Sequence, residues 1–231
     1  MNLPEIKYKI SWRLWRLYTD INSIISIKYI KKRFPEFKNY HDQINEIRNG
    51  ILPYHELYIS SISDAVNAIS LELSILIILL CNIKKPKRIL DLGSGFSSFL
   101  FNYYRTQAIS KPSIVSVDDN LEWLQKTDIF LRHFNLKHDK LISWEDFRRR
   151  HCDKFDLVLY DLGSMQFRKD NLINIIPMVN HSGILLLDDM HSVPYGPFAS
   201  NLLRKLGLEY YNLKYYIRDR FNRFAYLVIG Q

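Results

Sequence analysis

The stretch ILDLGSGFSS, residues 89–98, runs from an apolar strand through a glycine turn into the start of a helix. Apolar segments alternate with helical segments from this point to the end of the chain. The predicted strands cover residues 88–92, 113–119, 140–144, 155–163, 182–189, 210–218 and 223–230. Continuous apolar strands that alternate with helices indicate a mostly parallel sheet with both faces covered. The last two segments flank the short polar turn DRFN and predict an antiparallel hairpin.

These segments predict the fold class. We expect an α/β protein with a Rossmann-like, doubly wound, mostly parallel seven-stranded sheet, a C-terminal antiparallel hairpin and an N-terminal helical extension. The expected extension covers residues 1–58, and the expected sheet domain covers residues 59–231. Residues 55–83 are expected to form one long and largely buried helix, in which Ser63 or Asp64 caps a turn.

The composition of the 231-residue chain indicates a packed protein with a basic surface. A hydrophobic content of 47% and an aromatic content of 14% exclude a disordered chain. The net charge of +8 favours an anionic partner: nucleic acid, an acidic or phosphorylated small molecule, or an anionic membrane surface. Cys81 and Cys152 lie far apart and form no CxxC or Cys/His spacing, so neither a disulfide framework nor a zinc site is expected.

The sequence carries no pattern typical of secretion or membrane insertion. The most apolar run, residues 71–83, is shorter than the roughly 20 residues that a membrane-spanning helix needs. Basic residues interrupt the N-terminus where a signal peptide would be apolar. We therefore expect a cytoplasmic protein.

The first helical segment has an apolar stripe beside a basic face. Ile6, Ile10, Leu14 and Leu17 recur at spacings of three and four residues. The helix either packs on the sheet domain through this stripe or lies on an anionic membrane or against a partner, which leaves peripheral membrane contact open. The sequence does not predict the oligomeric state.

Acidic side chains follow five of the predicted strands. Ligands of doubly wound sheets bind beyond the carboxyl ends of the strands, so residues at these ends are candidates for function. The acids in question are Asp91, Asp118 and Asp119, Glu145 and Asp146, Asp161, and Asp188 and Asp189.

The glycine turn favours a cationic cofactor over a pyrophosphate. A dinucleotide motif has the form G-x-G-x-x-G, whereas this turn has Gly93, Gly95 and then Ser98. Asp91 would also repel a phosphate. S-adenosylmethionine (SAM) combines an adenosine with a cationic amino-acid tail and fits the turn. Asp118, 25 residues after Gly93, can accept the ribose hydroxyls, although this spacing also suits NAD and both Asp118 and Asp119 can instead cap the next helix.

Residues from about 60 to 231 resemble a class I SAM-dependent methyltransferase. The segments that carry the resemblance are DLGSGFSS, SVDDNLEWL, FDLVLYDLG and SGILLLDDMH. The resemblance implies that Asp91, Gly93, Ser94 and Gly95 face the methionine part of SAM and that Asp118 binds the ribose. It also implies that Glu145 or Asp146 approaches the adenine, although ISWEDF reads equally as a surface turn.

Three carboxylates at two neighbouring strand ends predict a site for a hard divalent cation, such as Mg²⁺. Asp161, Asp188 and Asp189 would hold the ion, which would acidify a substrate hydroxyl. This arrangement resembles the cation-dependent O-methyltransferases of the catechol and caffeoyl-CoA type. In a metal-free alternative, the aspartates act as the base or contact SAM.

One position departs from that family. Its members carry a lysine three residues beyond the first aspartate, and this chain has Ser164 there. The base is then His191, whose ordinary pKa lies near neutrality, or Lys169, unless the metal at Asp188 supplies enough acidification.

The acceptor is the least constrained part of the site. The loop HSVPYGPFA, residues 191–199, and the turn RDRFNR, residues 218–223, are expected over the cavity, where Tyr195 and Phe198 pack against a ring and an arginine meets an anionic group. DDMH together with DLGSGFSS also resembles bacterial methyltransferases of glycan and secondary-metabolite tailoring. The expected function is therefore O-methylation of a small-molecule or sugar hydroxyl.

Two alternative functions stay open. An RNA-directed methyltransferase suits the charge, but YDLGS stands where amino-methylating nucleic-acid enzymes have Asn/Asp-Pro-Pro-Tyr/Phe. The basic residues are also dispersed, and the densest cluster, residues 148–150, is of the kind that usually forms a solvated face. A non-catalytic protein that binds through its basic N-terminal helices is the other. The intact set of Asp91, Gly93, Gly95 and Asp118 argues against it.

Overall fold

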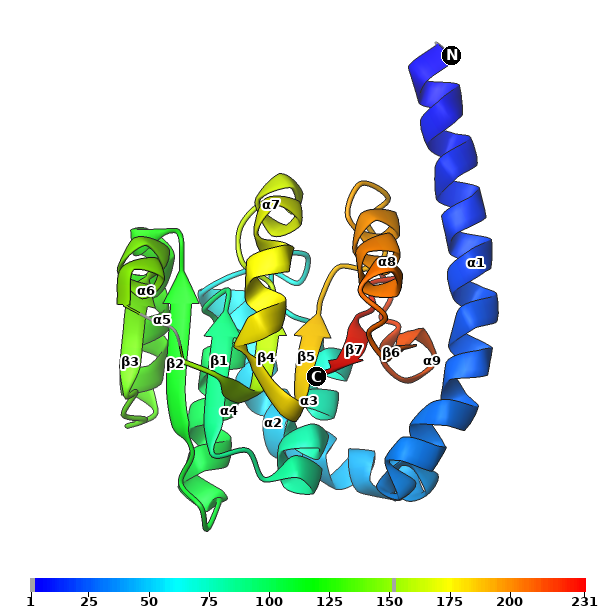
Figure 1. The fold of residues 1–231 in the computed structure, drawn as a ribbon. Helices are drawn as coiled ribbons and strands as arrows, with labels where there is room; N and C mark the ends of the chain where they lie inside the picture. The colour runs from blue at the N-terminus through cyan, green and yellow to red at the C-terminus, as the bar shows by residue number, and fades with distance from the viewer. Residues whose placement is uncertain (1–2, 151–152) are drawn as a thin grey trace.

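The computed structural model describes residues 3–150 and 153–231, and a seven-stranded sheet forms its centre (Figure 1). The strand order is β3-β2-β1-β4-β5-β7-β6, and β7 runs antiparallel to both of its neighbours. The strands are β1 Arg88–Leu92, β2 Ser113–Asp118, β3 Lys140–Ser143, β4 Phe155–Tyr160, β5 Val179–Leu187, β6 Tyr210–Asn212 and β7 Tyr226–Ile229. The predicted fold class is confirmed.

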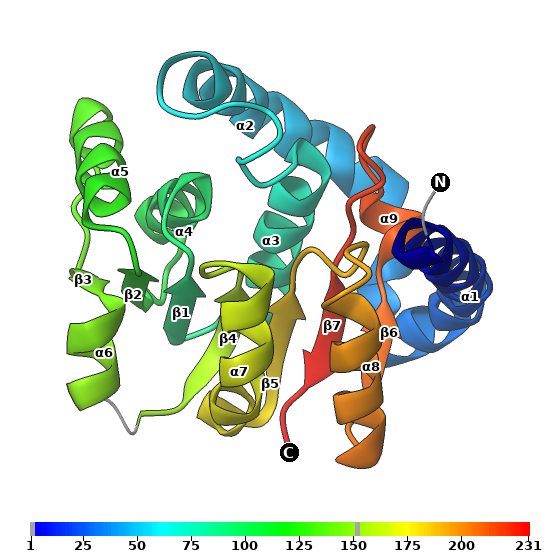
Figure 2. The same ribbon diagram turned by 90° about the horizontal axis from the view of Figure 1, so that it is seen from above.

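Helices cover both faces of the sheet (Figure 2). One face carries α3 Leu71–Lys84, α4 Phe96–Gln107 and α5 Leu121–His133, with α2 Tyr40–Ser61 packed on α3. The other face carries α6 Trp144–Arg150, α7 Met165–Ile175 and α8 Gly196–Lys205. The long α1 Leu3–Arg33 and the short α9 Lys214–Ile217 lie at the β6 edge. Two 3₁₀ turns, Pro35–Asn39 and Ile176–Met178, complete the elements.

The strand register brings the carboxyl ends of the parallel strands to one edge. Leu92 of β1 lies opposite Val117 of β2 and Tyr160 of β4, and Tyr160 lies opposite Leu187 of β5. The acids that follow these strands are therefore neighbours in space. The strands themselves are almost entirely buried, which explains their unbroken apolar sequence.

The predicted helix over residues 55–83 is wrong, because two helices with a loop between them occupy this range. Helix α2 ends at Ser61, and α3 begins after Ser70, whose hydroxyl accepts a hydrogen bond from the backbone N–H of Leu73 at 3.1 Å. Asp64 caps the turn between them by accepting from the backbone N–H groups of Val66 and Asn67. The caps at Asp64 and Ser70 stabilise the break between the two helices despite the apolar sequence on both sides. The predicted boundary between residues 58 and 59 falls inside α2.

The predicted strand over residues 210–218 is correct only at its start. Strand β6 ends at Asn212. The side-chain oxygen of Asn212 accepts from the backbone N–H of Lys214 at 2.9 Å, and α9 begins at Lys214. The antiparallel pairing of β6 with β7 is retained.

Helix α1 packs on the domain through a different face from the one that the sequence pattern suggested. Trp15 and Thr19 are buried, and the indole N–H of Trp15 donates to the carbonyl oxygen of Met190 at 2.9 Å. Leu14 and Leu17 instead point outward and are 64% and 60% exposed. Among the residues that the structure describes, no helix combines the length and the apolar character needed to cross a bilayer.

Candidate active site

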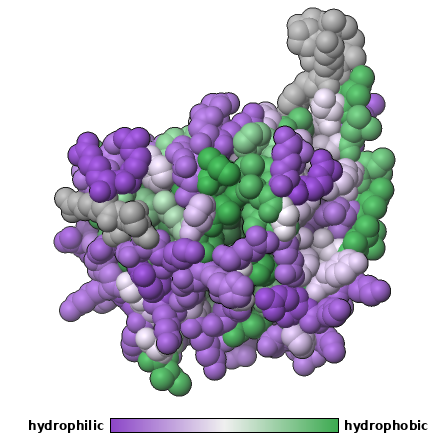
Figure 3. All heavy atoms as spheres, viewed as in Figure 1, coloured by the Kyte–Doolittle hydropathy of each residue, from purple (hydrophilic) through white to green (hydrophobic). Residues whose placement is uncertain are grey.

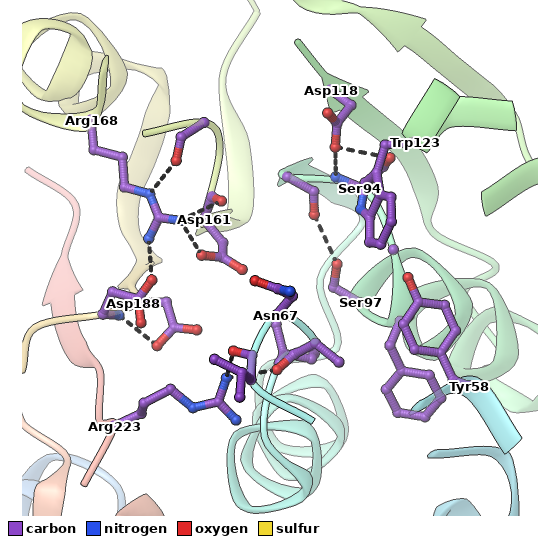
Figure 4. A pocket seen from close by; sticks show the side chains of 18 of the residues that line it. Tyr58, Asn67, Ser94, Ser97, Asp118, Trp123, Asp161, Arg168, Asp188 and Arg223 are labelled. Carbon is purple, nitrogen blue, oxygen red and sulfur yellow. Dashed lines mark hydrogen bonds and ion pairs between the residues drawn. The ribbon is translucent and has the colours of Figure 1, made fainter. Parts of the chain in front are cut away.

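A cavity of about 460 Å³ opens at the carboxyl edge of the sheet (Figure 4). Its wall comes from the ends of β1, β2, β4 and β5, from the loop between α2 and α3, and from the C-terminal turn. The residues that line it include Tyr58, Asn67, Gly93, Ser94, Gly95, Asp118, Trp123, Asp161, Arg168, Asp188, Asp189 and Arg223. The volume falls in the range of small-molecule and cofactor sites.

Gly93 allows the turn after β1 to approach the end of β4. Its φ is +103°, and a Cβ built on it would lie 2.7 Å from the backbone carbonyl carbon and oxygen of Asp161. No other residue type fits both this conformation and this contact. The sequence feature that predicted a cofactor turn is therefore also required by the packing of two neighbouring strands.

Asp91 lies beneath the turn and does not line the cavity. Its side chain is fully buried, one oxygen accepts from the Ser98 hydroxyl at 2.5 Å, and the other has no hydrogen-bond partner among the described residues. Burial raises the pKa of Asp91 to about 7. Asp91 therefore supports the turn from beneath, and its predicted role toward the methionine part of SAM stays a prediction.

Asp118 lines the cavity and is held by the glycine turn. Its Oδ2 accepts from the backbone N–H of Ser94 at 2.8 Å and from the Ser94 hydroxyl at 3.1 Å, and its Oδ1 accepts from the backbone N–H of Asn120. Burial raises the pKa of Asp118 to about 6. Asn120, rather than Asp118 or Asp119, caps α5. This leaves Asp118 positioned for a ligand, as the ribose prediction requires.

Two aromatic residues of the cavity wall were missed from the sequence. Tyr58 comes from α2, and a Cβ on Gly95 would lie 2.9 Å from the Tyr58 hydroxyl oxygen and 3.6 Å from the indole nitrogen of Trp123. Trp123 sits in the first turn of α5, three residues after its cap. That position was the available signal, because the first turn of a helix after a parallel strand faces the carboxyl edge. Both aromatic side chains therefore flank the glycine turn (Figure 4).

Arg168 of α7 is the largest addition to the predicted site. Its Nη2 lies 2.6 Å from Oδ1 of Asp161, and its Nη1 lies 2.9 Å from Oδ2 of Asp189. It also donates to the backbone carbonyl oxygens of residues 161–163. Burial lowers the pKa of the guanidinium, but the carboxylates of Asp161 and Asp189 outweigh burial and raise it, so Arg168 stays charged. The fixed cation lies where the sequence predicted a metal ion.

The described residues do not fit the predicted divalent cation. Arg168 already pairs with Asp161 and Asp189, two of the three predicted ligands. In residues 3–150 and 153–231 no group of three His, Cys, Asp or Glu side chains is arranged to hold a metal. A divalent ion at this position would have to displace the guanidinium from both carboxylates.

Asp188 is the one carboxylate of this cluster that pairs with no cation in the described part of the chain. It is 7% exposed, lines the cavity, and accepts from the backbone N–H of Asp189 at 2.6 Å. Burial, followed by the charges of Asp189 and Asp161, raises the pKa of Asp188 well above its ordinary value. A carboxylate with a raised pKa on a cavity wall is suited to accept a proton.

The other predicted catalytic residues lie elsewhere. His191 lines a smaller neighbouring cleft of about 70 Å³ with Trp12 and Trp15 of α1, and its Nδ1 is 3.5 Å from Asp189. Lys169 does not line the cavity, and its ammonium lies 6.0 Å from the ring centre of Phe198. Of the three predicted catalytic residues, only Asp188 reaches the cavity.

The residues predicted near the adenine and the acceptor are also placed differently. Glu145 and Asp146 open α6 and are not among the residues that line the cavity. Glu145 pairs with Arg148, and Asp146 accepts from the Ser143 hydroxyl at 2.9 Å. Tyr195 is fully buried and does not line the cavity.

Arg223 joins the C-terminal turn to the loop between α2 and α3. Its guanidinium donates to the backbone carbonyls of Ala65, Val66 and Ala68 and pairs with Asp219. The loop supplies Asn67 to the cavity wall. Of the turn at residues 218–223, Arg223 reaches the cavity wall, where it holds a second loop (Figure 4).

Comparison with known proteins places the fold. No family model and no curated protein matches the sequence. Among solved structures, a methyltransferase from Podospora anserina bound to S-adenosylhomocysteine (SAH) is 17% identical, with 82% of this chain and 88% of that chain covered and a TM-score of 0.60.

Two further structures are O-methyltransferases. One is from Bacillus cereus in complex with SAH, with 8% identity, 92% and 100% coverage and a TM-score of 0.58. The other is TomG from Streptomyces achromogenes in complex with SAM, which takes part in tomaymycin synthesis, with 10% identity, 92% and 99% coverage and a TM-score of 0.55. The chain therefore has the fold of the SAM-dependent O-methyltransferases of class I, as the sequence motifs predicted.

Proposed function

We propose that this protein transfers the methyl group of SAM to a hydroxyl of a small molecule or sugar. The observation that carries the proposal is that Asp188, a buried carboxylate with no ion-pair partner among the described residues, shares one cavity with Asp118 and the glycine turn. The fold is that of enzymes that bind SAM. Fold alone does not fix a reaction, so the proposal rests on this combination of groups.

In the proposed complex, the glycine turn and Asp118 hold the cofactor. Gly93 and Gly95 leave the cavity wall without side chains, so a ligand can approach the backbone. Asp118 accepts from the ribose hydroxyls, and Asp91 holds the turn from beneath through its hydrogen bond with Ser98. SAM supplies an electrophilic methyl group on a sulfonium.

Asp188 is the proposed general base. It takes the proton of the acceptor hydroxyl while the acceptor oxygen forms its bond to the methyl carbon and the bond from carbon to sulfur breaks. A general base of this kind contributes about 10²–10⁴ in rate. The positive sulfonium favours the ionised form of Asp188, which offsets the burial that raises its pKa.

We propose that Arg168 serves in place of a divalent cation. It supplies one positive charge shared between Asp161 and Asp189 and holds both in fixed positions beside Asp188. Both arginines that line the cavity, Arg168 and Arg223, are occupied by protein acceptors. We therefore propose a neutral acceptor, and among neutral acceptors a sugar or phenolic hydroxyl.

Calorimetric titration with SAM and SAH tests the cofactor. Asp118→Ala is expected to weaken SAM binding about tenfold to a hundredfold through the loss of charge-assisted hydrogen bonds. Asp119→Ala is the matched control, because Asp119 neighbours Asp118 but is exposed and does not line the cavity. Absence of SAM binding by the wild-type protein would refute the proposal.

Transfer of labelled methyl groups to a panel of catechols and monosaccharides tests the base and the cation. Asp188→Asn is expected to abolish transfer and to retain SAM binding, and EDTA is expected to change neither. Loss of transfer in His191→Gln with full activity in Asp188→Asn would assign the base to the histidine. Activity that EDTA removes and Mg²⁺ restores would contradict the role of Arg168.

A further inference from the structure

Helix α1 presents an apolar stripe to solvent on the side opposite its packed face. Ile10, Leu14, Leu17, Ile21 and Ile24 are 53%, 64%, 60%, 54% and 68% exposed. We call these five residues the outer stripe. Their spacing of four, three, four and three residues places them on one face of a helix over about 21 Å. Figure 3 shows hydrophobic atoms along this outer edge.

The opposite face of α1 fixes the helix to the domain. Trp15, Thr19, Ser23, Ser26 and Ile30 are all buried. The Ser26 hydroxyl accepts from the backbone N–H of Asn212, and the Asn212 amide donates to the carbonyl of Thr19 at 2.8 Å. Because the helix is anchored through these residues, it cannot turn to bury the outer stripe on its own domain.

The outer stripe is larger than the scattered exposed apolar residues of an ordinary surface. A contiguous apolar patch on a soluble protein marks a contact with another molecule or a membrane. Tyr18 and Tyr29, at 43% and 54% exposure, border the stripe on one side. Tyrosine is favoured where an apolar layer meets water, as at a membrane interface.

The charge of α1 identifies the partner. The helix contains eight basic residues and two acidic ones, and the acidic Asp20 lies 2.7 Å from the ammonium of Lys214. Arg13 borders the stripe, while Lys28 and Lys32 continue its line toward the end of the helix. A second copy of α1 would bring equally basic charge against this surface, whereas anionic lipid headgroups would complement it.

We propose that α1 binds the surface of an anionic phospholipid membrane and lies in the plane of the interface. The outer stripe enters the boundary between headgroups and acyl chains, and the basic residues contact anionic headgroups. This binding is inferred from α1 alone and does not rest on the proposed methyl transfer.

The test is co-sedimentation of the full chain with vesicles of phosphatidylcholine alone or with about 30% phosphatidylglycerol, a composition of roughly the anionic content that attracts basic helices. The protein is expected to bind the anionic vesicles and to dissociate as sodium chloride screens the headgroups. Ile10→Ser/Ile21→Ser/Ile24→Ser is expected to lower the partition coefficient about tenfold or more. The matched control is Ile109→Ser/Ile129→Ser/Ile173→Ser, which removes three exposed isoleucines outside α1.

A second variant keeps the test valid if the first fails to fold. Lys28→Glu/Lys32→Glu leaves the apolar surface intact and is expected to abolish the preference for anionic vesicles. Equal partition of wild type and the stripe variant would overturn the proposal. So would a wild-type dimer in light scattering that the stripe variant converts to a monomer without any binding to vesicles, because the stripe would then belong to a second copy.

Discussion

The Arg168 guanidinium lies 2.6 Å from the Asp161 carboxylate, at the end of β4 where sequence motifs predicted a metal ion. Asp189 holds the same guanidinium from the end of β5 at 2.9 Å. Helix α7, on the face of the sheet that also carries α6 and α8, thus supplies a cation to the ends of β4 and β5. Arg168 and Asp188 are buried and Asp161 and Asp189 are partly buried, so each group depends on the others for its charge state.

Replacing Arg168 is expected to destabilise the protein strongly. Arg168→Met leaves Asp161 and Asp189, whose side chains are 17% and 18% exposed, without this counter-charge. Removing one partner of a buried ion pair costs about 3–5 kcal/mol. Urea unfolding at neutral pH measures the effect. Arg168→Lys keeps the charge but loses the forked geometry of the guanidinium. Its free energy of unfolding is expected to lie between those of the wild type and Arg168→Met. If Arg168→Met is as stable as the wild type, the ion pairs carry no weight in the fold.

Asp91 is expected to make the stability of the protein depend on pH. Burial raises its pKa to about 7, so between about pH 4 and pH 7 the folded state holds a proton that the unfolded state has lost. The contribution of Asp91 is therefore favourable below this window and is lost as the pH rises through it. Asp91→Asn, which cannot ionise, is expected to be more stable than wild type at about pH 8 by a few kcal/mol.

The measurement is the free energy of unfolding of both proteins from about pH 4 to about pH 8. The difference between them is expected to grow across the window and to level off above about pH 7. A difference that stays constant with pH would show that the Asp91 carboxyl ionises as readily when folded as when unfolded.

Gly93→Ala is expected to lower stability by about 2 kcal/mol or more, because the new Cβ meets backbone atoms and the φ is left-handed. Gly50→Ala serves as the control. Gly50 lies in α2, and a Cβ added there would meet no atom within 4 Å, so alanine is expected to add about 0.5–1 kcal/mol. Thermal and urea unfolding report both changes. An unaltered Gly93→Ala protein would mean that the turn can move away from β4.

Arg223→Met is expected to loosen the loop between α2 and α3. Three backbone carbonyls at residues 65, 66 and 68 lose their donor, so their segment opens more often. Hydrogen exchange followed by mass spectrometry is expected to show faster exchange over residues 62–70 and unchanged exchange in β1 and β4. Arg220→Met, which removes an exposed arginine of the same turn, is the control. Equal exchange in both variants would contradict the role of Arg223.

Sequence patterns were sufficient for the sheet and for the acids at its edge. Asp118, Asp161 and Asp188 follow apolar strands, and parallel strands end at a shared edge, so their meeting follows from topology alone. The glycine turn was predictable because its residues are consecutive in the sequence and follow directly from a strand. These features are local in sequence or fixed by strand order.

Arg168 was not predictable from those patterns, because nothing local distinguishes it from Lys169. Neighbouring residues of a helix point about 100° apart, and only the packing of α7 on the sheet decides that Arg168 faces inward. The break between α2 and α3 was missed for a related reason. Apolar sequence on both sides of Asp64 favours a continuous helix, and the loop is held by Arg223, which lies far away in sequence.

The Trp15 indole connects two parts of the chain that are 175 residues apart. Its hydrogen bond ends on the carbonyl of Met190, which directly follows the cavity residue Asp189, so this bond is a direct contact between α1 and the segment that forms the cavity wall. Thermodynamic linkage makes such a connection reciprocal: if contact along α1 changes the affinity of the cavity for its ligand, filling the cavity changes the strength of that contact by the same factor. If the two sites are coupled in this way, the strength of the membrane contact along α1 depends on whether the cavity is occupied.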